Sequence, residues 1–341
     1  MLRSRKTILI ASGLTVFAIA GAVLLYSGLR RSEAVEASPS AELFSELPAG
    51  APTLVYADLA AIRASSFYKQ RPDHGPIALP DHDYAEFMQS TGFDFEKDLD
   101  RVAMAAWPLD PGQEKNKPAQ QKIILVAEGR FDQRKIRDYA TRKGKIDRQQ
   151  GHDVFQFSNT ARPGVSSLTF LNDHRIAIVE GPSIAPLLEH RGETSAGDPA
   201  RQRAARVEGA AVFVIARAPT APENFAPGGA QSAQLLSMAK SVQWITLAAR
   251  PEGDNLRLSL EGECQTATDA RQIQSALQLL RMLGQAGLES PKTRKSMDPA
   301  TFELAETLLK SADVSATAER VRILVELTPD ILKLGGARVP H

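Results

Sequence analysis

The longest uninterrupted apolar stretch of the sequence lies near its start. Between Lys6 and Arg30 there are 23 residues without a charge, 7–29. As a helix rising about 1.5 Å per residue they would extend roughly 34 Å, enough to cross a hydrocarbon core of about 30 Å. A cleavable signal peptide has a shorter apolar region of about 7–15 residues. We therefore expect residues 1–31 to be an uncleaved signal anchor with a transmembrane helix; cleavage after Ala37 is the alternative.

Further along, two periodicities of apolar residues predict strands and helices. Leu256, Leu258 and Leu260 alternate with polar neighbours, which is the period of a half-buried strand, and residues 321–327 repeat this pattern. Between these two segments, apolar residues recur at helical spacing over residues 273–287. Asp298 followed by a proline is typical of the start of another helix.

The first half of the chain has shorter apolar runs separated by turn residues. The run Thr53–Ala57 predicts a buried strand. Asp132 is suited to cap a helix that ends near Lys143. Further strands are expected at 102–107, 122–128, 153–157, 166–171 and 174–180, and a short helix at 182–190.

Three short landmarks recur in the same order in both halves of the sequence. Residues 50–57 resemble 209–216, residues 105–108 resemble 248–251, and the strand ending at 128–129 resembles the one ending at 261–262. Each half then reads as strand, helix, two strands, helix and two strands, which indicates two copies of one unit. The alternative is that apolar strands ending in glycine resemble each other by composition alone.

These patterns predict an α+β fold class, with an N-terminal single transmembrane helix followed by two related, mainly antiparallel sheet-plus-helix units. The expected organisation is a signal anchor at 1–31, a linker at 32–41, a first unit at 42–191 and a second at 200–341. The units would form two packed antiparallel sheets, or one larger sheet, with helices on one face.

Composition and charge say more about the expected cellular location of the protein than about its function. The chain has 341 residues, 43% hydrophobic and 24% charged, which excludes a disordered or collagen-like protein. Its net charge of +1 divides into +5 on residues 1–31 and −4 on the rest, with no basic excess that would indicate nucleic acid as a partner. Because basic residues are more numerous before the apolar run than after it, the N-terminus is expected inside. Residues 42–341 would then be periplasmic, on a protein of the inner membrane.

The candidates for catalysis are few. Ser66-Phe67-Tyr68-Lys69 matches the S-x-x-K pattern of penicillin-recognising enzymes, in which the serine attacks and the lysine helps to remove its proton. Ser237 and Lys240 match it as well, and the other elements of that family, S-D-N and K-T-G, are missing. We therefore assign no catalytic residue and keep Ser66 and Lys69 as weak candidates.

The candidates for metal or cofactor binding are equally few. The densest group of potential ligands is Asp73, His74, Asp81, His82 and Asp83, in a proline-rich segment read as a loop. Its spacing fits no known signature, so we assign no metal site and keep His74 and His82 as weak candidates. Glycine-rich phosphate-binding motifs are absent from the sequence, and no cofactor is expected.

The remaining features of the sequence are its single cysteine and two short segments that resemble those of other proteins. Cys264 has no partner for an intrachain disulfide and is expected to be a small packing residue. The stretches 46–59 (ELPAGAPTLVYADL) and 128–132 (EGRFD) resemble phrases of membrane-anchored bacterial envelope proteins of unknown function. That resemblance implies an exported α+β protein and carries no catalytic residues.

The function expected from the sequence is that of a membrane-tethered, exported, non-catalytic binding or scaffold protein of the bacterial envelope. Its expected partners are the lipid bilayer, through residues 7–29, and an envelope protein or ligand that the sequence does not identify. Nucleic acid is not expected as a partner. The alternative is an exported hydrolase, of the serine type through Ser66 and Lys69 or metal-dependent through His74 and His82.

Overall fold

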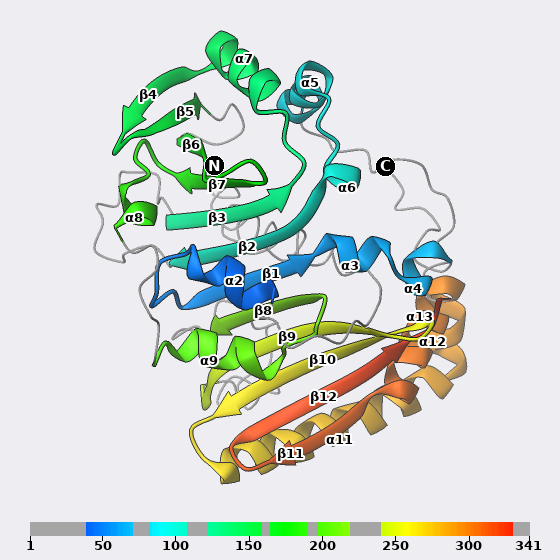
Figure 1. The fold of residues 1–341 in the computed structure, drawn as a ribbon. Coiled ribbons are helices and arrows are strands. Elements are labelled where there is room, and N and C mark those ends of the chain that lie inside the picture. Colours follow the sequence, from blue (N-terminus) through cyan, green and yellow to red (C-terminus); the bar gives the residue numbers. More distant parts are fainter. Residues whose placement is uncertain are drawn as a thin grey trace, which may run out of the picture. The chain divides into compact units, whose positions relative to one another are not determined.

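The computed structural model has an α+β fold (Figure 1). It describes residues 39–70, 82–107, 122–158, 164–189, 197–218 and 240–329. The chain divides into two compact units, which we describe separately. The described residues of Ser32–Ala60 and Gly75–Gly209 form the first, which we call the seven-strand unit. The described residues of Ala61–His74 and Ala210–His341 form the second, which we call the five-strand unit.

The seven-strand unit is built on antiparallel strands in the order β1-β2-β3-β7-β6-β5-β4. The strands are β1 (Thr53–Asp58), β2 (Leu99–Trp107), β3 (Lys122–Gly129), β4 (Lys145–Gln149), β5 (His152–Ser158), β6 (Val165–Phe170) and β7 (Arg175–Glu180). The helices are α2 (Pro39–Ser45), α5 (His82–Thr91), α6 (Phe95–Asp98), α7 (Gln133–Lys143), α8 (Ala185–Leu188) and α9 (Pro199–Arg206).

Helices cover both faces of this unit's strands. On one face α2 buries Leu43 and Phe44, and the ring of Phe44 lies 6.1 Å from that of Tyr56 on β1. On the other face α7 buries Ile136 and Ala140 against a cluster that includes Phe155 of β5. Because successive residues of a strand point to opposite faces, β3 contributes to both cores.

The five-strand unit has antiparallel strands in the order β8-β9-β10-β12-β11. They are β8 (Val212–Arg217), β9 (Val242–Glu252), β10 (Asn255–Cys264), β11 (Asp313–Thr317) and β12 (Arg320–Leu327). The chain enters this unit within α3 (Leu59–Arg63), and the unit's other helices are α4 (Ser66–Lys69), α11 (Ala267–Glu289), α12 (Pro291–Ser296) and α13 (Pro299–Ser311).

The core of the five-strand unit lies between α11 and the strands. Cys264, Ala270 and Val321 form its buried cluster. Cys264 is therefore a packing residue, as expected, and its burial raises the pKa of its thiol. On β11, the last strand in the order, side chains of α11 cover backbone carbonyls: Gln274 and Gln278 both donate to the oxygen of Val314.

The predicted fold class is confirmed as α+β but is wrong in its organisation. Among the described residues, the first unit has seven antiparallel strands and the second unit has five. The helices differ as well, so the described strands and helices of the two units do not repeat one arrangement.

The predicted transmembrane helix, residues 7–29, lies outside the described residues. Among the helices that are described, none is both long enough and apolar enough to cross a membrane.

The predicted elements with a strong pattern are confirmed. Asp132 caps α7 by accepting from the backbone N–H of Lys135 at 3.0 Å, and Asp298 caps α13 in the same way. The helical spacing over residues 273–287 corresponds to α11. The sequence reading missed β4 and α9, and placed a junction where α9 begins.

A substitution at Gly129 tests the packing at the end of β3. A Cβ at this position would overlap the backbone oxygen of Asp98, whereas a Cβ at Gly164 would meet nothing within 4 Å. We expect Gly129→Ala to lower the free energy of unfolding by about 1–3 kcal/mol through steric overlap. Chemical denaturation measures this change, and Gly164→Ala is the matched control. Equal effects of the two substitutions would contradict the close approach at Gly129.

Candidate functional site

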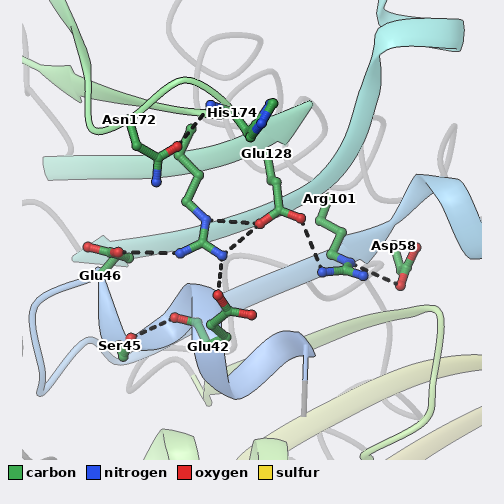
Figure 2. Close-up of polar contacts among 9 residues, drawn as sticks. Glu42, Ser45, Glu46, Asp58, Arg101, Glu128, Asn172 and His174 are labelled. Atoms are coloured by element: carbon green, nitrogen blue, oxygen red, sulfur yellow. Dashed lines mark hydrogen bonds and ion pairs between the residues drawn. The ribbon is translucent and has the colours of Figure 1, made fainter. Parts of the chain in front are cut away.

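A row of alternating charges crosses four adjacent strands of the seven-strand unit (Figure 2). In the strand register Asp58 of β1 lies opposite Arg101 of β2, Arg101 opposite Glu128 of β3, and Glu128 opposite Arg175 of β7. We call these four residues the charge row. Directly opposed cross-strand pairs of unlike charge stabilise a sheet, so each member of the row favours this register.

The contacts within the charge row centre on Glu128. Its Oε1 accepts from Nη1 of Arg101 at 3.1 Å, and its Oε2 accepts from Nε of Arg175 at 2.9 Å. Nε of Arg101 lies 3.6 Å from Oδ2 of Asp58. One carboxylate thus joins two guanidinium groups that come from strands on either side of it.

Helix α2 closes the row at its Arg175 end. Glu42 pairs with Nη2 of Arg175, and Oε1 of Glu46 lies 3.5 Å from Nη1. The side chain of Arg175 is 14% exposed and therefore faces three carboxylates with little water around it. Burial lowers the pKa of Arg175, but hydrogen bonds to Glu42 and Glu128 outweigh this effect and raise it above its usual value.

Tyr56 extends this polar system toward the core. It precedes Asp58 by two residues, so both side chains lie on the same face of β1. Burial, followed by the nearby charge of Asp58, raises the pKa of its phenol well above the usual value. The hydroxyl of Tyr56 therefore stays protonated and acts as a neutral hydrogen-bonding group.

An open cleft of about 610 Å³ lies at one end of the charge row, where Glu128 and Arg175 line it. Its walls come from α2, from the start of β2, from the end of β3 and from the turn between β6 and β7. The lining residues are Glu42, Asp100, Glu128, Gly129, Arg130, Asn172, Asp173, His174 and Arg175. A second cleft of about 500 Å³ shares Arg130, Asp173 and His174 with the first and continues toward α7.

The turn between β6 and β7 is held in place by several hydrogen bonds. Oδ1 of Asn172 accepts from the backbone N–H of His174 at 2.9 Å, and the backbone oxygen of His174 accepts from the N–H of Gly129 at 2.9 Å. Gln133 of α7 donates to the backbone oxygen of Asn172 at 3.2 Å. These bonds fix the backbone of the residue that carries the imidazole at the edge of both clefts.

The two clefts carry more acidic than basic side chains. Arg130 lies 3.4 Å from a carboxylate oxygen of Asp98 and 3.7 Å from one of Asp100. The carboxylate of Asp132 accepts a hydrogen bond from the backbone N–H of Lys135, which lowers its pKa. Such a lining suits a polar ligand that brings hydrogen-bond donors or positive charge.

The weak catalytic candidates do not belong to these clefts. Ser66 and Lys69 are the first and last residues of α4, in the five-strand unit, and the side chain that caps this helix is that of Ser65, which accepts from the N–H of Tyr68 at 2.8 Å. Of the second S-x-x-K match, Ser237 lies outside the described residues.

The weak metal candidates remain a prediction. His74 lies outside the described residues, and His82 is the first residue of α5. Within the described part of the chain, His, Cys, Asp and Glu side chains do not gather in groups of three or more that could hold a metal ion.

The sequence did not predict the cleft, but two stretches singled out in it contain residues of the cleft, of the charge row or in contact with that row. The two stretches that carry the family resemblance, 46–59 and 128–132, contain Glu46, Asp58, Glu128 and Arg130. Their partners Arg101 and Arg175 come from other strands and were not recognised. The signal that could have found them is a charged residue at one terminus of each strand, near the last residue of β1 and β3 and near the first residue of β2 and β7.

Comparison with known proteins gives similar solved structures only. No family model and no curated protein matches the chain. Crystal form III of TP0453 has a TM-score of 0.45 and 10% identity, over 89% of this chain and 100% of TP0453. Crystal form I has a TM-score of 0.41 and 10% identity, over 86% and 96% of the two chains. At this level of similarity we transfer no property from TP0453 to this chain.

Replacement of Arg175 tests the role of the charge row. Arg175→Met leaves three carboxylates facing one another with reduced access to water, so we expect a loss of about 2 kcal/mol or more in the free energy of unfolding. The control is Arg137→Met, which removes an exposed ion pair with Asp153. Exposed pairs contribute little, so this change should be much smaller. Equal losses in a urea titration would contradict the row as a stabilising element.

Proposed function

We propose that this chain is a membrane-tethered, exported binding protein of the bacterial cell envelope, without catalytic activity of its own. Residues 7–29 insert in the lipid bilayer of the inner, cytoplasmic membrane, and residues 42–341 lie on its periplasmic side. An envelope protein or a polar ligand binds in the clefts of the seven-strand unit, and nucleic acid is not a partner.

The observation that carries this proposal is the position of the cleft at the Glu128 and Arg175 end of the charge row. The charged side chains beneath it are already engaged with one another, so little ordering is needed when a ligand arrives. The turn between β6 and β7, which carries His174, is held by hydrogen bonds and also needs little ordering when a ligand arrives. A site with paired charges and a fixed rim is suited to binding a ligand.

The support for tethering comes from the sequence. The uncharged run 7–29 is long enough for a hydrocarbon core of about 30 Å, and basic residues are more numerous before it than after it. Residues 30–38 separate this run from α2, which contributes Glu42 to the pairing with Arg175. The first described element after the proposed tether is therefore also a wall of the cleft.

The topology is tested with a reporter enzyme. Alkaline phosphatase folds only after export, so a fusion after residue 341 of the full chain should be active. The same fusion lacking residues 7–29 should be inactive, because the export signal is then gone. An inactive full-length fusion would place the folded part inside the cell and contradict the proposal.

Binding in the cleft is tested with a photoreactive amino acid at position 174 of the full chain in its native membrane. We expect one discrete adduct that disappears when Asp173→Lys is added, because this change reverses a negative charge that lines both clefts. The control position is Ile146 on β4, which is 42% exposed and lines neither cleft. The same adduct pattern at both positions would argue against a specific site.

The hydrolase alternative has its own test. Without catalytic activity, the full chain should not be labelled by a fluorophosphonate or β-lactam probe. Labelling that is lost in Ser66→Ala would establish a serine nucleophile and overturn the non-catalytic assignment.

A further inference from the structure

Helix α11 of the five-strand unit exposes large apolar side chains to solvent. Leu279, Leu280, Met282 and Leu283 are 52%, 45%, 55% and 59% exposed. They lie within one helical turn of each other, so they form a single patch, which we call the α11 patch.

The α11 patch is not needed for the unit's own packing. Helix α11 lies along β11 and β12 (Figure 1), and the side that faces these strands is not the side that carries the patch. Ala270 and Leu288 are buried there, Ile273 and Leu277 pack against the core, and Gln274 and Gln278 bond to β11. An amphipathic helix normally turns charged and polar residues to solvent, whereas the outward side of α11 carries leucine and methionine.

Charge is also unusual in this part of the chain. Between Arg271 and Glu289 the only charged residue is Arg281, and its guanidinium donates to the backbone oxygen of Ala312, away from the patch. Residues 267–296, which comprise α11 and α12, hold five basic and two acidic residues, a net charge of +3, although residues 32–341 together carry −4. A basic segment with an exposed apolar patch thus lies in an otherwise acidic part of the chain.

We propose that the α11 patch, with the basic α12 beside it, docks on the surface of an anionic phospholipid bilayer. Leucine and methionine side chains insert at the boundary of headgroups and acyl chains, and the basic residues attract the negative headgroups. This inference rests on the proposed membrane tether, which keeps the unit close to a bilayer.

A second copy of the chain is a less suitable occupant. Four neighbouring side chains are few compared with the roughly 20–30 residues that each partner contributes to a stable protein interface. Shallow insertion in a bilayer requires no such area, because the proposed tether already keeps the five-strand unit close to the membrane surface.

The test uses the full chain reconstituted in phosphatidylcholine vesicles, with or without about 30% phosphatidylglycerol. Met282→Cys carries an environment-sensitive fluorophore, and brominated lipids report its contact with acyl chains. The native Cys264 is buried and its thiol pKa is raised, so it is protected from labelling. The control is Glu303→Cys, an exposed position on α13.

We expect brominated lipids to lower the fluorescence at position 282 about twofold in anionic vesicles, and less in neutral ones or at high salt. The control position should be unaffected, and adding Leu279→Glu and Leu283→Glu should remove the quenching at position 282. Unquenched fluorescence in anionic vesicles would overturn the inference, as would a disulfide between the position 282 cysteines of two chains when the unlabelled variant is oxidised.

An alkaline wash of the same vesicles separates this inference from the proposed function. If the chain remains in the bilayer but position 282 is not quenched, the tether stands and the docking fails. If the wash releases the chain, the tether fails and the inference that rests on it fails too.

Discussion

The charge row is the constraint on which the seven-strand unit depends. Asp58, Arg101, Glu128 and Arg175 face their neighbours only in the observed register, and a slip of one residue would turn one partner to the opposite face of the sheet. The same row reaches α2 through Arg175 and so holds a helix against the strands. Glu128 and Arg175 also line the cleft, so interactions that set the register contribute to the shape of the cleft.

Much of the local structure could be predicted from the sequence, and the failures have physical causes. Asp298 before a proline correctly indicated α13, and the same Asp-Pro pair at residue 198 begins α9, where Asp198 accepts from the N–H of Ala200 at 2.9 Å and from Gly50 at 3.0 Å. That signal was present and was read as a junction. Strand β4 (Lys145–Gln149) was missed because it contains mostly polar residues and lies last in its strand order, with one face of little apolar content.

The organisation of the sheet and of the cleft could not be predicted in the same way. Two units with one shared arrangement were expected because apolar strands with glycine at the end recur, but the described strands and helices of the two units differ. Arg101, Glu128 and Arg175 come together only through strand pairing, which depends on contacts between residues far apart in the sequence. A charged residue at the end of a strand indicates a cross-strand ion pair only when the strand order is known.

The central claim is that the charge row, two members of which line the cleft, acts as one unit. Asp58 and Arg175 lie at its two ends and interact through Arg101 and Glu128. The most direct measurement is a double-mutant cycle on the unfolding free energy of the full chain with Asp58→Asn and Arg175→Met. The account predicts a coupling of about 0.5 kcal/mol or more between the ends, whereas strictly additive effects of the two substitutions would contradict it.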